Sequence, residues 1–116
     1  MSTDQDTTVA ELRQLIADFI RERDWEQFHD PKNLAMAIGT EAAELMEHFR
    51  WVKNDESRDM ACDPEVKAKA GEELADILAF VLSFANTAGI DITTSLKAKM
   101  AKNDKKYPAD QYKGRY

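Results

Sequence analysis

Apolar residues recur at intervals of three and four along most of the chain, which is the repeat of one face of an α-helix. Polar stretches at residues 23–30 and 52–63 interrupt this repeat, and we interpret both as connections. Glycine (4) and proline (3) are scarce, which favours helices because all-β chains need many turn residues. The pattern predicts four helices, at residues 9–22, 32–51, 65–88 and 92–106.

Local signals mark the ends of these helices. Thr8 and Glu11 have the spacing of a capping box. Asp30 and Asp63 each precede a proline, the order of a helix N-cap followed by a first-turn proline. Gly89 is suited to end the third helix. Because the connections are short, we expect neighbouring helices to pack antiparallel in a four-helix bundle-type protomer.

The length of 116 residues fits one domain, residues 1–116, with a core at about 8–108 between a polar N-terminal and a basic C-terminal tail. A domain this small gains from burying surface between subunits, so we expect an oligomer. No apolar run approaches the ~20 residues of a membrane span, and the polar N-terminus does not resemble a signal peptide. With a lone Cys62, a reducing cytoplasmic setting and no membrane partner are expected.

The charge is uneven along the chain. The net charge is −6, which argues against duplex nucleic acid as a general partner. Residues 97–116 hold seven Lys and Arg against two Asp, a net charge of +5, so residues 1–96 carry −11. The basic end is either a solvated helix and tail or an anion-binding segment that folds against an acidic centre.

Acidic residues stand where the second helix should be apolar. At ~100° per residue, Glu41 lies about 20° from Leu34, at the edge of the stripe that also holds Leu45. Glu44 lies about 60° further round the same helix. A carboxylate on an apolar stripe loses hydration, which is unfavourable unless a cation compensates.

The third helix repeats this anomaly. Between residues 74 and 85 only Asp76 and Ser83 are polar, so this helix should be buried on most sides. Glu73 falls near Phe80 on the helical wheel, and Asp76 follows it at the i, i+3 spacing that shares a face. Each of the two helices thus presents a pair of acids toward an apolar interior.

Four clustered carboxylates repel one another, and a divalent cation relieves that repulsion. Ligands that are all oxygen suit Mg²⁺, Mn²⁺ or Ca²⁺ rather than Zn²⁺. We expect Mg²⁺, with Mn²⁺ as a substitute, bound by Glu41, Glu44, Glu73 and Asp76. An isolated Glu-x-x-Glu pair is usually solvated, and the argument depends on there being two pairs at core positions.

A di-iron site is the rival metal class. Such bundles use Glu-x-x-His on two helices. The one match here, Glu26 and His29, falls in an expected connection, and His48 has the wrong spacing from Glu44. Di-iron chemistry is therefore disfavoured.

Aromatic residues flank the acidic helix, at Trp25 and His29 before it and Trp51 after it. Their rings could stack on a nucleobase, and Phe80 could line the same pocket. The alternative is that these residues seal the end of the bundle.

Polar residues also interrupt the apolar side of the fourth helix. Asn103, with Lys99, Lys106 and Tyr107 nearby, could hydrogen-bond to and neutralise a polyphosphate. Alternatively, Asn103 does not bind a polyphosphate and only lies near a frayed helix end.

Four segments resemble the MazG-like superfamily of all-α nucleoside triphosphate pyrophosphohydrolases, and within it most closely the dCTP pyrophosphatases. The segments are ERDWEQFHDPKNL (22–34), GTEAAELMEHFRW (39–51), EELADIL (72–78) and KMAKNDKKYP (99–108). The resemblance implies hydrolysis of a (d)NTP to its monophosphate and pyrophosphate, and Mg²⁺ held by the four acids.

The resemblance also assigns substrate residues and an assembly. It implies a base pocket that includes Trp25, Trp51 and Phe80, and polyphosphate contacts from Asn103, Lys99 and Tyr107. His29 and Lys32 also match. It implies a homotetramer, a dimer of dimers, whose sites draw on more than one subunit.

Two positions depart from the vertebrate enzymes, which have His and Tyr where this chain has Ile16 and Phe80. Both changes remove polar groups from the expected base side. From the resemblance as a whole we expect an enzyme of nucleotide metabolism that acts on dCTP or modified dCTP, and we expect Glu41 or Glu44 to accept the water's proton. A broad-specificity house-cleaning hydrolase and a non-catalytic, metal-binding oligomerisation module are the alternatives.

Overall fold

The structure is a computed structural model that describes residues 2–115. Every regular element in this range is helical, which confirms the expected all-α class. The elements are α1 (Val9–Glu22), the short 3₁₀ helix η1 (Glu26–Phe28), α2 (Pro31–Glu47), α3 (Asn54–Cys62), α4 (Pro64–Ala88), α5 (Ile92–Lys106) and α6 (Ala109–Tyr112).

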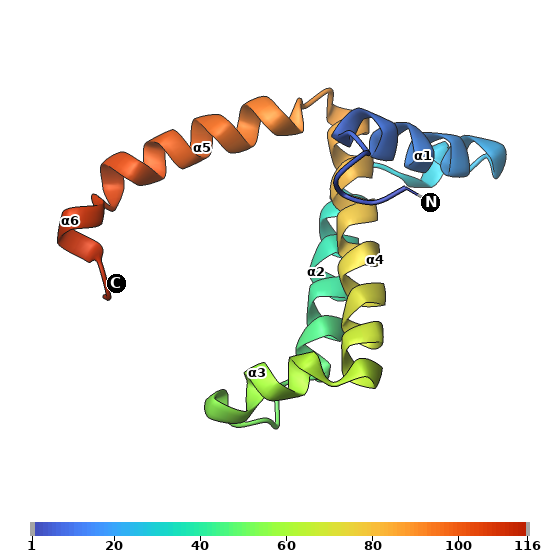
Figure 1. Cartoon of the computed structure of the whole chain (residues 1–116). Helices are drawn as coiled ribbons and strands as arrows, with labels where there is room; N and C mark the ends of the chain where they lie inside the picture. The colour runs from blue at the N-terminus through green and yellow to red at the C-terminus, as the bar shows by residue number, and fades with distance from the viewer. Residues whose placement is uncertain (1, 116) are drawn as a thin grey trace.

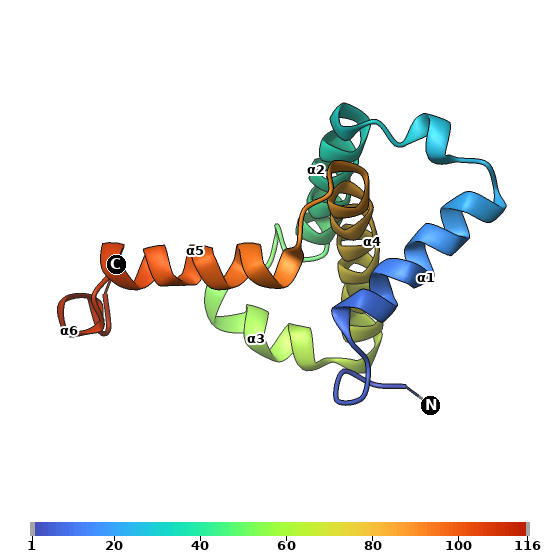
Figure 2. The same cartoon turned by 90° about the horizontal axis from the view of Figure 1, so that it is seen from above.

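An antiparallel pair, α2 and α4, forms the centre of the molecule (Figure 1). Leu34 of α2 and Leu82 and Ala85 of α4 are buried. Helix α1 crosses the C-terminal half of α4, where its Ile20 is also buried (Figure 2). The few buried apolar side chains of residues 2–115 therefore lie at one end of the α2/α4 pair, beneath α1.

The predicted helix boundaries largely hold. The Thr8 backbone N–H donates to Glu11 Oε2 at 2.6 Å, and the Glu11 N–H donates to Thr8 Oγ1 at 3.1 Å, which completes the capping box. Asp63 Oδ2 accepts from the Val66 N–H at the start of α4. Gly89 ends α4 with φ of 68°, a left-handed conformation that glycine adopts without strain.

The interpretation of residues 52–63 as a loop is wrong, because nine of them form α3. This helix is polar and its apolar residues form no stripe, so periodicity could not reveal it. Asp55 and Glu56 lie in its first turn, where negative charge interacts favourably with the helix dipole. The second helix correspondingly ends at Glu47, four residues earlier than expected.

Helix α5 does not join α1, α2 and α4 in a bundle. It leaves α4 at 102° and projects away from the central pair in both views, with α6 at its far end (Figures 1 and 2). Leu96 and Met100 of α5 are more than half exposed as a result. The expected antiparallel packing thus describes α2 and α4, whereas the fourth expected helix is an arm.

No single helix within residues 2–115 is long and apolar enough to cross a membrane. Helices α4 and α5 satisfy that length and composition only when taken together, across their bend.

Candidate active site

Three of the four predicted metal ligands converge between the central helices. Glu41 of α2 and Glu73 and Asp76 of α4 each place one carboxylate oxygen within 4.8 Å of the other two. The antiparallel pairing brings them together, because it sets the middle of α2 against the first half of α4. Glu41 and Glu73 are partly buried, whereas Asp76 is exposed.

The fourth acid, Glu44, belongs to the same electrostatic group. The pKa of Glu41 is raised above its ordinary value, first by a hydrogen bond with the Glu44 side chain, and then by burial and by the charges of Glu44, Asp76 and Glu73. A proton between Glu41 and Glu44 would relieve the repulsion between these two carboxylates. The same negative field would favour a cation.

The residues present fit a hard divalent cation. One oxygen of Glu41 and one of Glu73 are buried with no hydrogen-bond partner, and burying such atoms is unfavourable. Octahedral Mg²⁺ holds oxygens at about 2.1 Å, so opposite ligands are about 4.2 Å apart. The observed spacing of up to 4.8 Å needs only small side-chain adjustments to meet this geometry.

His48 lies beside the acidic cluster, and the sequence did not predict this position. Its Nε2 lies 3.5 Å from Glu73 Oε1. The one signal in the sequence is that His48 follows Glu44 by one helical turn, which places both on the same side of α2. Its acidic neighbour lies on another helix, so spacing along α2 could not identify it.

His29 and Phe80 lie together, with ring centroids 6.5 Å apart, which links the connection before α2 to α4. Phe80 follows Asp76 by one turn on α4. The Nδ1 atom of His29 is buried and has no hydrogen-bond partner. Two predicted substrate residues therefore meet next to the acids.

A cavity of about 360 Å³ opens beyond this pair, between α1, the connection and α4. His29, Ser83 and Asn86 are among its polar lining residues. Ser83 is one of the two polar residues in the apolar stretch of α4, and that anomaly is the sequence signal for the cavity. Arg21 also lines it, and no sequence pattern had marked it.

The two tryptophans are not brought together within one chain. Trp25 precedes α2 and packs edge-on against Phe19, with centroids 5.8 Å apart. Trp51 follows α2, is 83% exposed and lies under the Arg50 guanidinium. The 17 residues of α2 between them span about 25 Å. Lys32, in the first turn of α2, is exposed.

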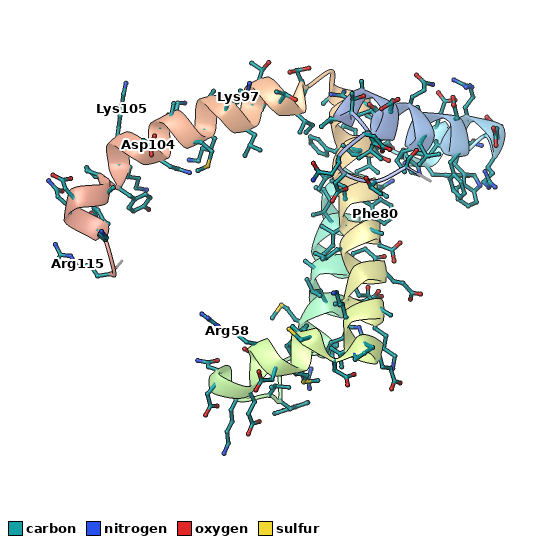
Figure 3. All side chains as sticks on the ribbon, in the orientation of Figure 1. Arg58, Phe80, Lys97, Asp104, Lys105 and Arg115 are labelled. Carbon is teal, nitrogen blue, oxygen red and sulfur yellow. The ribbon has the colours of Figure 1, made fainter. Side chains whose placement is uncertain are left out.

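The predicted polyphosphate residues also lie apart from the acids in one chain. All four lie on α5 or directly after it, and α5 projects from the pair of helices that holds the acidic cluster. Figure 3 shows this separation: Asp104 and Lys105 on α5 are far from Phe80 on α4. The residues concerned are Lys99, Asn103, Lys106 and Tyr107. Locally, Asn103 Nδ2 lies 3.8 Å from the sulfur of Met100, and Lys106 Nζ lies 5.3 Å from the Tyr107 ring.

Comparison with known proteins identifies the family of this chain. Residues 36–115, which contain all four acids, match the MazG-like family. The chain is 37% identical to dCTP pyrophosphatase 1 of Bos taurus, over 97% of this chain and 67% of that protein. It is 38% identical to dCTP pyrophosphatase 1 of Homo sapiens, over 88% of this chain and 60% of that protein. The chain thus spans about two thirds or less of these relatives' length.

A solved structure agrees in fold. A crystallised pyrophosphatase from Archaeoglobus fulgidus is 35% identical, covers 93% of this chain and 99% of its own, and superposes with a TM-score of 0.82. These matches confirm the resemblance found in the sequence and support the predicted enzyme class, a nucleoside triphosphate pyrophosphatase. This chain belongs to the MazG-like family.

Proposed function

We propose that this chain, as a single MazG-like domain, is a Mg²⁺-dependent pyrophosphohydrolase that converts a (d)NTP and water to the (d)NMP and pyrophosphate. The observation that carries the proposal is the convergence of Glu41, Glu73 and Asp76 on one point between α2 and α4. The preferred substrate is dCTP or a modified dCTP, in line with the names of the relatives. A reducing, cytoplasmic setting suits the exposed free thiol of Cys62.

The chemistry follows from the acids. Glu41, Glu73 and Asp76 would hold the cation, with Glu44 beside them. When bound, Mg²⁺ supplies neutralisation of the charge on the phosphate oxygens. A water attacks the α-phosphorus, the bond to the oxygen that bridges to the β-phosphorus breaks, and pyrophosphate leaves. Glu41 or Glu44 accepts the water's proton, and the raised pKa of Glu41 favours a carboxylate here as the proton acceptor.

The nucleotide would extend from the acids in two directions. Its base would lie toward Phe80 and His29, whose rings are already paired. Trp25, Trp51 and Lys32 would complete this side. The triphosphate would be held by side chains at the outer part of the arm, Lys99, Asn103, Lys106 and Tyr107.

Because α5 projects away from the acids of its own chain, we assign these contacts to the arm of another subunit in a homotetramer, a dimer of dimers. Large apolar side chains that one chain leaves exposed support this assembly. Met36 and Met46 of α2 and Leu74 of α4 are all more than half exposed. Burial of such side chains between subunits is favourable.

Broad specificity is the second candidate function. Ile16 and Phe80 lack the polar groups that would read a base edge, which favours a hydrolase of several nucleotides. A non-catalytic metal-binding module would bind the cation without turnover.

One assay separates these functions. Each (d)NTP is incubated with the protein and Mg²⁺, or with EDTA, and the products are identified. Pyrophosphate release that EDTA abolishes supports the proposal, and the ranking of nucleotides separates a dCTP enzyme from a broad one. Orthophosphate with a diphosphate would move the attack to the γ-phosphorus and overturn the mechanism. No turnover of any nucleotide would favour the binding module.

A further inference from the structure

Arg13 joins three parts of the chain that are far apart in the sequence. Its Nε donates to Asn86 Oδ1 of α4 at 2.8 Å, and a guanidinium NH group donates to the Ile90 carbonyl at 2.7 Å. Asn86 returns a hydrogen bond from Nδ2 to the Arg13 carbonyl at 3.1 Å. One arginine therefore connects the backbone of α1, a side chain of α4 and the turn that follows α4.

That turn sets the direction of α5. It contains only Gly89, Ile90 and Asp91, and both of its ends are capped. The Ile90 N–H donates to the Ala85 carbonyl, and Asp91 Oδ2 accepts from the N–H and hydroxyl of Thr94. Between these caps, the Ile90 carbonyl is the group that Arg13 binds.

The arm amplifies small changes in this turn. Helix α5 has 15 residues, which gives a length of about 22 Å. A rotation of about 10° at the turn would move the far end of the helix by about 4 Å. No other element of the same chain packs extensively on α5 within residues 2–115. The direction of the arm therefore depends on the turn and on what holds it.

We propose that Arg13, together with Asn86, is a positioning residue that fixes the direction of α5 and so places Lys99 and Asn103 at the nucleotide. Its effect on substrate rests on the proposed function, whereas its effect on the arm does not. A residue that merely stabilised α1 against α4 would change the free energy of unfolding and leave the direction of the arm in the folded protein unaltered.

The direction of the arm can be measured without turnover. Spin labels are attached to Cys62, the chain's only cysteine, and to a second cysteine made by Lys105→Cys. Cys62 ends α3 close to the start of α4, so it marks the central pair, and Lys105 lies at the far end of α5, which projects from that pair (Figure 1). Dilution with unlabelled protein restricts pulsed electron spin resonance to distances within one chain.

Arg13→Met keeps the apolar stem and removes the guanidinium. We expect the distance distribution to broaden or shift by about 4 Å. Gln14→Met is the matched control, because Gln14 is the next residue on α1 and bonds only within that helix, to Asp18. Asn86→Ala should act like Arg13→Met, which keeps the test decisive if one variant folds poorly. Distributions that match the wild type in both variants would overturn the proposal.

The effect on substrate has a separate readout. We expect Arg13→Met to raise KM for the nucleotide by on the order of tenfold, with the Mn²⁺ affinity of the acidic cluster unchanged. Arg13→Lys, which can still donate to the Ile90 carbonyl, should recover part of the loss. A broadened arm with an unchanged KM would refute the role in substrate positioning. Absence of turnover in the wild type would instead refute the proposed function, and the distance measurement would remain valid.

Discussion

Glu41 on α2 and Glu73 on α4 each bring one carboxylate oxygen within 4.8 Å of the other, and each buries an oxygen that has no hydrogen-bond partner. Two helices that pack through apolar residues thus meet at their acids rather than avoiding them. The arrangement is unfavourable without a proton or a cation between the carboxylates.

Removing one of these carboxylates should remove cation binding. Glu73→Gln preserves shape and deletes the charge, so we expect Mn²⁺ affinity to fall by at least about tenfold, or about 1.4 kcal/mol. Titration calorimetry measures this directly. Glu72→Gln is the matched control, since Glu72 is the preceding residue on α4 and is exposed. Equal losses in both variants would indicate a general effect of charge rather than a site.

The stability of the cation-free protein should decrease as the pH rises above about 4.5, the ordinary pKa of Glu41. The pKa of Glu41 is raised in the folded state, so the folded protein binds this proton more tightly than the unfolded chain does. The contribution of this proton to the free energy of unfolding is present at low pH and is lost by the time the pH exceeds the raised pKa of Glu41.

Urea denaturation in EDTA across this range measures the effect, with Glu41→Gln as the comparison. The difference in stability between the variant and the wild type should grow with pH. Added Mg²⁺ should reduce the loss in the wild type alone. A difference that does not vary with pH would contradict the assigned shift.

The buried end of the α2/α4 pair should dominate stability. Leu34 is 2% exposed, so Leu34→Ala removes packed atoms and leaves a cavity, and we expect a loss of about 2–5 kcal/mol in the free energy of unfolding. Leu15→Ala is the control, because Leu15 is 63% exposed on α1. Denaturant titration compares the two. A loss as large at Leu15 would show that α1 is covered in the assembled protein.

Two inactive variants should form an active oligomer when they are refolded together, if each active site contains residues of two subunits. Glu41→Gln removes an acid and Asn103→Ala removes a contact on the arm. A mixed oligomer, formed by unfolding and refolding the two together, contains some sites with both residues intact. We therefore expect turnover to recover in the mixture, measured by pyrophosphate release. No recovery after co-refolding would place both residues in one chain's site.

Local chemistry explains which parts of the fold were predictable. The capping box at Thr8 and the stop at Gly89 depend on neighbours within a few residues, and both formed as expected. Helix α3 was missed because its stability comes from polar residues and from packing on α4, neither of which produces an apolar stripe. The contact between His48 and Glu73 could not be predicted either, because it depends on how α2 and α4 pair.

The sequence by itself determined α1, α2, α4 and α5, the apolar faces of α2 and α4, and the four acids that interrupt those faces. These follow from spacing along one helix, which a chain carries in its order of residues. Only the tertiary structure decided that Glu41 meets Glu73 and Asp76, that His29 meets Phe80, and that α5 leaves as an arm. Such contacts depend on the angles of short turns and on how helices pack, and a small change at Gly89–Asp91 redirects every residue that follows.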